Sequence, residues 1–292
     1  MIPLILSVFF SSLIFLIFKL FDTFKVNRLQ AIVFNYGVAC ICGMVDYGNT
    51  TRILKMHNEH WFMYTVGLGV TFIAIFNLMG ITAQRNGLSV VAVASKMSVV
   101  IPIIVGVFFF KESTSWIKIL GLFLALTAIY LVSYDADADS RLKRSNLALP
   151  ILVFFGSGFV DVSLKFLEHT YIDPSEIALF SVSLFASAFF AGILIFSYQI
   201  ADGEFNFDFR SIFGGFVLGV ANYFSIFFLM EALTYRGLNS STIFTINNIS
   251  VLVFTSILGL IFFKERLTAL KFSGILLAII SIFLVSLSEI SF

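Results

Sequence analysis

The sequence has 292 residues, of which 59% are apolar and 12% are charged, and its formal net charge is +1. A soluble protein of this length needs more charged residues to cover its surface. The composition therefore excludes a soluble globular domain and indicates an integral membrane protein.

Long apolar runs follow one another along the chain. A helix needs about 20 apolar residues to cross a hydrocarbon core of roughly 30 Å, and these runs lack the alternation of outer-membrane strands. We therefore predict an all-α polytopic membrane protein with ten transmembrane helices. The predicted spans are 2–21, 28–46, 61–83, 87–110, 115–134, 147–167, 176–199, 212–234, 237–263 and 267–288.

Several common sites and signals are missing from these runs. The first run has no basic n-region and no A-x-A site, so we do not expect a cleaved signal peptide. Cys40 and Cys42 fit small buried hydrophobes, and the stretch 57–60 lacks the spacing of a zinc site. No G-x-x-x-x-G-K-[ST] sequence is present, which excludes a P-loop nucleotide site. We expect no cofactor and no metal.

Two stretches of the chain resemble each other. Residues 108–133, FFFKESTSWIKILGLFLALTAIYLVS, match residues 261–286, IFFKERLTALKFSGILLAIISIFLVS. The matches include polar and small positions at an offset of 153, namely Lys111/Lys264, Glu112/Glu265, Lys118/Lys271, Gly121/Gly274, Ala125/Ala278 and Ser133/Ser286. Weaker matches join the starts of the two halves, and Gly87-Leu88 resembles Gly237-Leu238. We therefore predict a first five-helix repeat at 1–134, a polar linker at 135–146 and a second repeat at 147–292.

An odd number of spans in each half has a geometric consequence. The second half must enter the membrane from the opposite side, so the two repeats are inverted relative to each other. Inverted repeats are typical of secondary transporters, which bind their substrate near the midplane between the halves. The alternative is a duplication that serves stability alone.

The repeated Lys-Glu turns also carry a resemblance to a known family. Lys111-Glu112 with Gly121, and Lys264-Glu265 with Gly274, resemble the EamA-like members of the drug/metabolite transporter superfamily. Pro102 fits the proline of the fourth helix in that family, whereas the ninth helix has no proline at the corresponding place. The resemblance implies passive or ion-coupled movement of amino acids, metabolites or drugs, often outward. It also implies a central cavity lined by helices one to four and six to nine, with the fifth and tenth at the periphery.

Lys96 lies near the middle of an apolar run, where an ionisable group costs about 2.5–3.5 kcal/mol. At 100° per residue, Lys96 and Ser95 share a small and polar stripe, whereas Val90, Val93 and Met97 lie on an opposite arc suited to lipid or close packing. We predict that Lys96 and Ser95 face the bundle interior and bind a solute with a carboxylate or another anionic group. The alternative is a lysine that snorkels or bonds backbone carbonyls.

Other polar residues lie inside spans that should surround the same space. The stretch 239–250 places polar side chains on two faces of the ninth helix, and we expect this helix opposite the fourth across a central site. Each of these residues alone is explained by an interhelical hydrogen bond. Together they predict a binding pocket with Lys96 and Ser95. These further pocket candidates are Asn35, Tyr36, Asn77, Asn222, Tyr223, Thr245, Asn247 and Asn248.

Two acids complete the candidate site. Asp161 is the acid placed deep in a span, and Glu231 lies toward the end of the eighth helix. Asp161 either pairs with Lys96 or with Lys165, four residues further along, or it carries a proton during the cycle. The sequence leaves both interpretations open.

We predict a secondary transporter of small organic solutes that works by alternating access, as an exporter or exchanger. The alternatives are a channel or a sensor without a transport cycle. An enzyme is not expected, because no clustered carboxylates, histidines or nucleophile are visible.

The expected partners are a small-molecule substrate and the lipid bilayer, with no nucleic acid. The chain should be a monomer or homodimer in a prokaryotic inner membrane. Gly121 with Ala125, and Gly274 with Ala278, fit either a dimer contact or packing within the monomer. The orientation stays open, because the loop charges favour termini outside and the resemblance favours termini inside.

Overall fold

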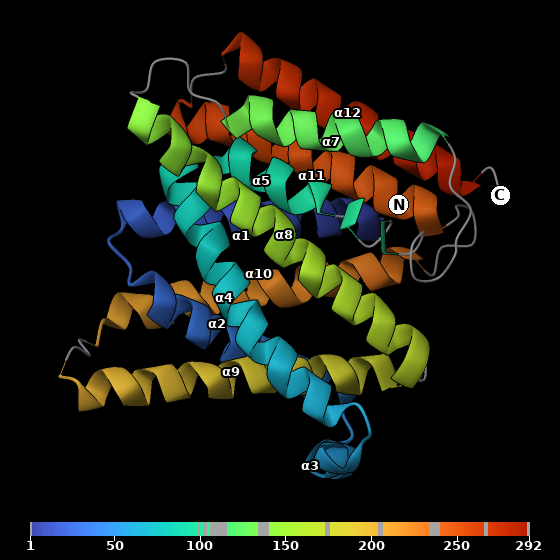
Figure 1. The fold of residues 1–292 in the computed structure, drawn as a ribbon. Coiled ribbons are helices and arrows are strands. Elements are labelled where there is room, and N and C mark those ends of the chain that lie inside the picture. Colours follow the sequence, from blue (N-terminus) through green and yellow to red (C-terminus); the bar gives the residue numbers. More distant parts are fainter. Residues whose placement is uncertain are drawn as a thin grey trace. The chain divides into compact units, whose positions relative to one another are not determined.

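The described part of the chain consists of helices (Figure 1). The computed structural model describes residues 2–98, 100–101, 104–105, 116–133, 140–172, 176–203, 207–233, 240–265 and 268–290. No β-strand occurs within these ranges. The predicted all-α class is therefore confirmed.

The helices follow the predicted runs closely, with differences at some ends. α8 begins at Ser140, inside the stretch predicted as a linker, and the short helix α3 in the loop after the second span was not predicted. A single turn η1 (Met56–Asn58) follows α3. The helices are α1 (Ile2–Thr23), α2 (Arg28–Tyr47), α3 (Thr50–Lys55), α4 (Phe62–Asn86), α5 (Leu88–Met97), α7 (Trp116–Ser133), α8 (Ser140–Tyr171), α9 (Ile177–Ala201), α10 (Phe209–Leu233), α11 (Ser240–Phe263) and α12 (Ala269–Ile290).

Seven stretches of the described helices are long and apolar enough to cross a membrane. The chain is therefore a multi-pass membrane protein. The three shorter apolar helices lie where the fourth, fifth and tenth spans were predicted, at Leu88–Met97, Ile119–Val132 and Ala269–Leu284. The seven candidate spans are Ile2–Thr23, Arg28–Tyr47, Phe62–Asn86, Leu147–Leu164, Ile177–Ala201, Phe209–Leu229 and Ile246–Phe263.

The ends of α2 show why a helix begins and stops where it does. The Asn27 side chain accepts a hydrogen bond from the Gln30 backbone N–H at 3.2 Å, which satisfies a donor that lacks a partner inside the helix. At the other end Gly48 adopts a left-handed conformation with φ 68°, and its N–H bonds the Met44 carbonyl. Local capping therefore delimits this span.

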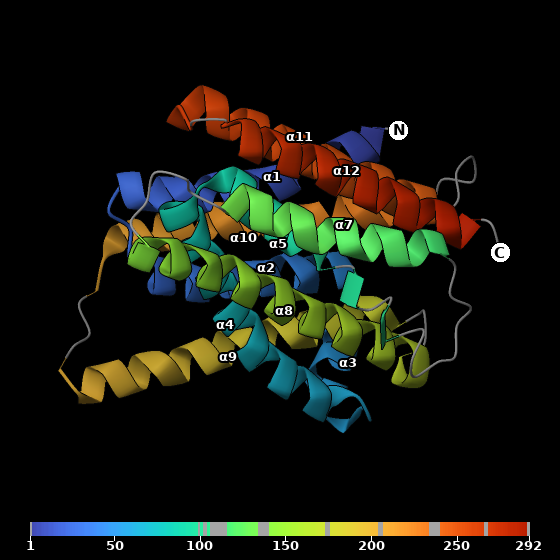
Figure 2. The same ribbon diagram turned by 45° about the horizontal axis from the view of Figure 1, so that its top comes forward.

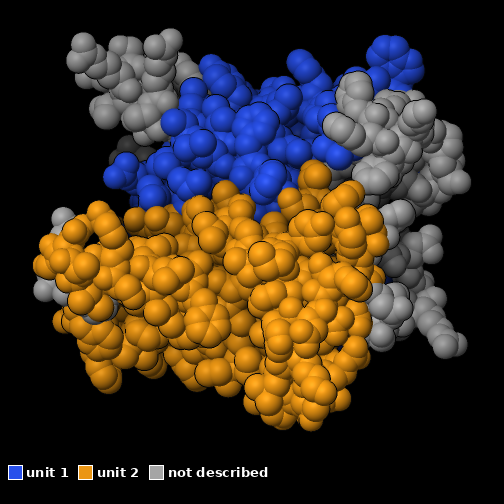
Figure 3. Space-filling view, turned by 60° about the horizontal axis from the view of Figure 1, so that its bottom comes forward, with its two compact units in different colours: residues 1–19, 78–161, 224–292 blue, residues 20–77, 162–223 orange. Residues whose placement is uncertain are grey.

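The chain forms two compact units (Figure 3). Unit 1 comprises Met1–Lys19, Leu78–Asp161 and Phe224–Phe292, and unit 2 comprises Leu20–Asn77 and Val162–Tyr223. Each unit therefore takes segments from both predicted repeats, and α1, α4, α8 and α10 contribute residues to both units.

In unit 1, α7 and α12 run side by side (Figures 1 and 2), and α5 packs against α7 and α11. Val90, Val93 and Met97 of α5 are buried in this core together with Leu252 of α11. Of the two environments predicted for this arc of the fourth helix, lipid or close packing, these three residues therefore have close packing. Buried aliphatic side chains of this kind supply most of the packing energy of a core.

The contact between α7 and α12 is built twice from equivalent positions. The Ser281 hydroxyl donates to the Gly121 carbonyl at 2.7 Å, and Gly274 lies against Ala128 and Val132. Gly121 and Gly274 are separated by 153 positions, as are Ala128 and Ser281. The small residues thus let α7 and α12 approach closely within one chain.

In unit 2, α2 and α9 pack against each other with the same reciprocity. A side chain at Gly43 would contact Val182, and a side chain at Gly192 would overlap Val33. Both glycines and both valines are separated by 149 positions. The core of this unit also includes these buried residues from the loops and helices around α9: Ile53, Trp61, Leu68, Leu167, Ile172, Leu179, Phe180 and Leu184.

Candidate functional site

The predicted pocket residues belong to both units. Unit 2 contains Asn35, Tyr36, Asn77, Asn222 and Tyr223. Unit 1 contains Ser95, Lys96, Asp161, Glu231, Thr245, Asn247 and Asn248.

Lys96 and Asp161 interact electrostatically within unit 1. Lys96 lies in the last turn of α5 and Asp161 on α8, and both side chains are partly buried. The two ion pairs formed among the described residues are both at Arg52, so Lys96 and Asp161 attract each other without forming a direct ion pair. The side chain of Lys165, the other predicted partner of Asp161, lies outside the described residues.

Ser98 links Asp161 to the end of α5. Its hydroxyl oxygen lies 2.9 Å from Asp161 Oδ2 and 2.6 Å from the Ser95 carbonyl oxygen. Regular helix ends at Met97, and the Ile101 N–H bonds the Ser98 carbonyl at 2.9 Å. Ser98 was not among the predicted site residues. Its position three residues after Ser95 was the available signal, because residues three apart lie on one helical face.

A close approach between α8 and the segment after α5 positions this contact. A side chain at Gly158 would overlap Ile101. Gly158 lies three residues before Asp161, so the missing side chain brings the backbone of α8 close to Ser98. We define the Lys96 cluster as Ser95, Lys96, Ser98 and Asp161.

Asn247 of α11 is 2% exposed and contacts α1. The Ser7 hydroxyl oxygen lies 3.2 Å from Asn247 Oδ1 and 3.0 Å from the Ser225 carbonyl oxygen. Asn247 thus forms a hydrogen bond to a neighbouring helix, which is the explanation that applies to each of these residues alone. Asn248 is partly buried, and the side chain of Thr245 lies outside the described residues. Glu231 is exposed on α10.

Glu265 of the second Lys-Glu turn caps α5. Its carboxylate accepts a hydrogen bond from the Leu88 backbone N–H at 2.7 Å, at the first residue of that helix. Gly87 and Gly259 leave the space for it, because a side chain at either would lie 2.8 Å from a Glu265 carboxylate oxygen. A carboxylate is favourable at this end of a helix. The first turn, Lys111-Glu112, lies outside the described residues, as does Pro102.

In unit 2 the structure brings Asn35 and Asn222 together. The Asn222 amide donates to Asn35 Oδ1 at 3.3 Å, and the two side chains are 5% and 0% exposed, respectively. Gly219, one turn before Asn222, lies against the Asn35 carbonyl and Val38. Two predicted pocket residues therefore form a buried hydrogen bond between α2 and α10.

Tyr36 is fully buried among aromatic rings. Its ring centroid lies 5.5 Å from Phe76, 6.3 Å from Phe185 and 6.4 Å from Phe72. Among the described residues its hydroxyl has no hydrogen-bond partner. A buried hydroxyl normally finds a partner, so this group is available for a ligand or for another conformation.

The two remaining candidates of unit 2 have partners of their own. Asn77 Oδ1 accepts from Arg28 Nε at 2.8 Å, and the Tyr223 hydroxyl hydrogen-bonds Asp46. Arg28 was missed by the sequence analysis because it lies at the boundary of the predicted span. Its side chain is partly buried, so Arg28 places a cation beside Asn77 at the start of α2.

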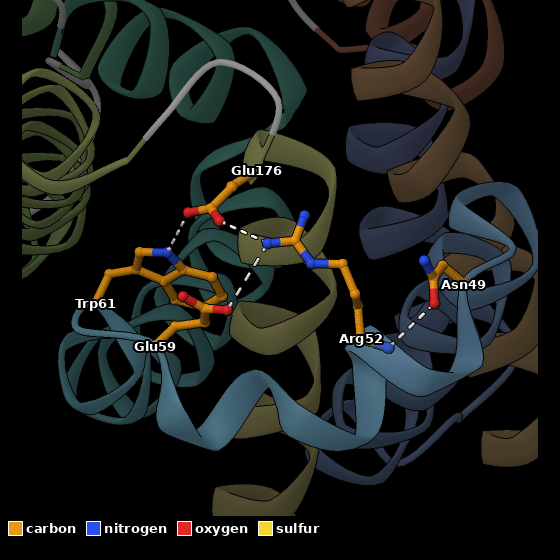
Figure 4. A network of polar contacts seen from close by, with 5 residues as sticks. All are labelled: Asn49, Arg52, Glu59, Trp61 and Glu176. Carbon is orange, nitrogen blue, oxygen red and sulfur yellow. Dashed lines mark hydrogen bonds and ion pairs between the residues drawn. The ribbon is translucent and has the colours of Figure 1, made fainter.

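Glu176 holds together the loop segments outside the spans (Figure 4). Its two carboxylate oxygens accept from Arg52 at 2.8 Å and from the Trp61 ring N–H at 3.2 Å. Glu59 lies 3.9 Å from the same guanidinium, and Asn49 caps α3 through the Arg52 backbone N–H. This network fastens α3 and the start of α4 to the start of α9. The polar groups of this network form hydrogen bonds and ion pairs with one another, so we assign the network a structural role.

The comparisons with known proteins give one relative. The chain is 28% identical over 262 residues to an uncharacterized protein of Haemophilus influenzae, with 87% of each chain covered. No family model matches the chain. Across the described residues that were searched, no group of three His, Cys, Asp or Glu side chains is placed to hold a metal ion.

Proposed function

We propose that this chain is a secondary transporter of small anionic solutes, built from two inverted five-helix repeats. The membership that we propose is the EamA-like group of the drug/metabolite transporter superfamily. Its Lys-Glu turn at 264–265 has a physical role here, because Glu265 caps the helix that carries Lys96.

The observation that carries the proposal is the reciprocity of the helix contacts. Each contact recurs between the equivalent residues with the two helices exchanged. At an offset of 149 the contact of Gly43 with Val182 is matched by that of Gly192 with Val33. At an offset of 153 the contact of Gly121 with Ser281 is matched by that of Gly274 with Ala128. In each pair of contacts the two residue numbers have a constant sum, so the equivalent helices run antiparallel. A two-fold axis in the membrane plane makes equivalent helices antiparallel, whereas an axis along the membrane normal makes them parallel. This is the arrangement expected of inverted repeats.

Lys96 supports an anionic solute. It interacts with Asp161 without a direct ion pair, so its ammonium retains donors for a solute carboxylate. An ammonium inside a membrane protein usually marks a substrate or ion pathway. The solute is therefore expected to carry a carboxylate or another anionic group.

The test is counterflow in proteoliposomes with radiolabelled amino acids, carboxylic acids and nucleosides. We expect saturable exchange of an anionic member of the panel. Lys96→Gln should lower the rate at least about tenfold, because a hydrogen bond to a charged group contributes about 1.5–3 kcal/mol. Lys55→Gln is the matched control, since Lys55 is exposed at the end of α3.

Two outcomes would contradict the proposal. One is equal exchange by the wild type and Lys96→Gln, and the other is a continuous conductance without saturation, which would favour a channel. Both variants are first compared with the wild type for thermal unfolding in detergent, so that a lost fold is not mistaken for lost transport.

A further inference from the structure

The Ser98 hydroxyl faces two acceptors but has one proton. Its oxygen lies 2.6 Å from the Ser95 carbonyl oxygen and 2.9 Å from Asp161 Oδ2. A carbonyl and an ionised carboxylate can only accept hydrogen bonds. When Asp161 is ionised, the Ser98 hydroxyl must therefore leave one of the two without its full hydrogen bond.

A proton on Asp161 resolves this conflict. The protonated carboxyl donates to Ser98 Oγ, and the Ser98 hydroxyl then donates to the Ser95 carbonyl. Every donor in this chain has one acceptor, and both distances are normal for O–H···O bonds. The distances at the end of α5 thus accommodate a proton on Asp161.

The hydroxyl of Ser7 shows that the conflict is specific to a carboxylate. It also faces two acceptors, the Ser225 carbonyl and Asn247 Oδ1. Rotation of the Asn247 amide by 180° presents an N–H₂ donor instead, because the oxygen and nitrogen of an amide are interchangeable in shape. A carboxylate has no such choice and becomes a donor only by binding a proton.

Lys96 acts in the opposite direction. Among the described residues it is the charged group that acts on Asp161, and its ammonium favours the ionised carboxylate. Lys165 follows Asp161 by four residues on α8, and its side chain lies outside the described residues. The Ser98 oxygen is placed to accept a hydrogen bond from protonated Asp161, whereas the Lys96 ammonium favours the ionised carboxylate. Asp161 is therefore held between two states by groups of one cluster.

We propose that Asp161 is a proton-binding site that couples proton uptake to binding of the anionic solute at Lys96. The coupling rests on the proposed transport function. When a solute carboxylate engages the Lys96 ammonium, less positive potential acts on Asp161. A proton taken up from the aqueous phase then binds Asp161 Oδ2. The proton and the solute are released together on the other side of the membrane. Thermodynamic linkage requires the reverse effect as well, so a bound proton strengthens solute binding.

Protonation of Asp161 also affects a backbone hydrogen-bond acceptor at the end of α5. Protonation decides whether Ser98 bonds the Ser95 carbonyl or the Asp161 carboxylate, and the Ser95 carbonyl belongs to the last turn of α5. Gly158 holds α8 close enough for this exchange. Ser95 and Ser98 are therefore positioning residues, and Asp161 carries the proton.

Infrared difference spectra of the reconstituted protein between acidic and alkaline buffer test the site without any solute. We expect the C=O stretch of a protonated carboxyl that disappears at alkaline pH in the wild type and is absent from Asp161→Asn. Asp202→Asn, in an exposed loop, should keep the band. In Lys96→Gln the band should persist to higher pH, because the opposing charge is gone. A wild-type spectrum without an Asp161-dependent band would overturn the proposal.

Solute-driven proton flux tests the coupling. Proteoliposomes containing the trapped dye pyranine, supplied with the solute found by counterflow, should acidify inside as the solute enters. Asp161→Asn should lose acidification and lose accumulation driven by a pH gradient. Ser98→Thr should retain coupling and Ser98→Ala should weaken it, since threonine keeps the hydroxyl.

The outcomes separate the two proposals. Counterflow that is driven by sodium, or that leaves the dye unchanged, would overturn proton coupling and leave the transport function intact. An absence of counterflow for every solute, with a titrating Asp161 band, would overturn transport while the proton site remains. A sodium gradient is therefore included as a parallel arm.

Discussion

Tyr36 is a residue whose polar group the fold leaves unused. It is 0% exposed, its ring packs against three phenylalanines, and its hydroxyl has no partner in the part of the chain described. Burying such a hydroxyl without a hydrogen bond costs about 1–3 kcal/mol. A cost of this size is easier to explain if the hydroxyl serves binding.

Tyr36→Phe separates stability from function. We expect the variant to be more stable by about 1 kcal/mol, because the unsatisfied hydroxyl is removed while the ring contacts remain. If Tyr36 contacts the solute, the KM of solute exchange should also be higher in the Tyr36→Phe variant than in the wild type. Thermal unfolding in detergent and counterflow measure the two effects.

Tyr198→Phe provides the control, since Tyr198 is 69% exposed and should change neither quantity. A Tyr36→Phe protein that is clearly less stable would show that the hydroxyl has a structural partner, and would remove the reason to assign it to the solute.

The candidate site could be predicted in part from single residues. Lys96 and Asp161 stand out in the sequence because charges are costly inside a span. Ser98 and Ser7 do not, because serine is tolerated in membrane helices and its role depends on what lies opposite. Asn77 and Tyr223 were grouped with the pocket, whereas the structure pairs them with Arg28 and Asp46.

At the scale of elements, α5 is held at both ends by groups from elsewhere in the chain. Glu265 accepts from the Leu88 N–H at its start, and Ser98 meets Asp161 at its end. The helix has ten residues, and a helix of this length is marginal without tertiary support. The position of Lys96 therefore depends on these contacts.

Removing the Glu265 carboxylate tests this dependence. Glu265→Ala should lower the stability by about 0.5–2 kcal/mol, which is the usual cost of losing an N-terminal cap. Glu265→Gln should lose less, because its amide oxygen still accepts from Leu88. Unfolding in detergent gives the stability, and equal stability of all three proteins would show that the cap does not hold α5.

Two glycines of α4 form a matched pair for close helix packing. A side chain at Gly69 would lie 2.6 Å from the Ala188 backbone nitrogen of α9, whereas Gly67 has nothing within 4 Å. Gly69→Ala should therefore destabilise the protein by about 1–3 kcal/mol through overpacking. Gly67→Ala should be neutral or stabilising by up to about 1 kcal/mol, because alanine is the better helix former.

The comparison is made by thermal unfolding of both variants. Equal effects at the two positions would mean that α4 and α9 can separate without loss. Gly219 makes a similar close approach to the Asn35 carbonyl and Val38 at an offset of 150, so the result bears on both halves of the proposed duplication.

At the scale of the whole molecule, the proposed inversion fixes which loops share a side. The loop after the second span contains His57, and the loop after the seventh contains Asp202, and both residues are exposed. They follow corresponding spans of the two repeats. Inverted repeats must therefore expose them on opposite sides of the membrane.

Single cysteines test this arrangement. With Cys40 and Cys42 replaced by serine, His57→Cys and Asp202→Cys should differ in labelling by a membrane-impermeant thiol reagent in intact cells. Only one of the two should react until the cells are opened. Labelling of both from the outside would contradict the inversion.

The sequence by itself determined the class of the molecule. Composition and run length determined an all-α multi-pass protein, because the bilayer accepts few spanning structures and helices satisfy their own backbone. The tertiary structure decided which residues meet, including Ser98 with Asp161, Glu265 with Leu88 and Asn35 with Asn222. These partners are 63, 177 and 187 residues apart, so no local pattern encodes them. They follow from the close approach that glycines such as Gly158 and Gly219 allow, which depends on the neighbouring helix as much as on the glycine.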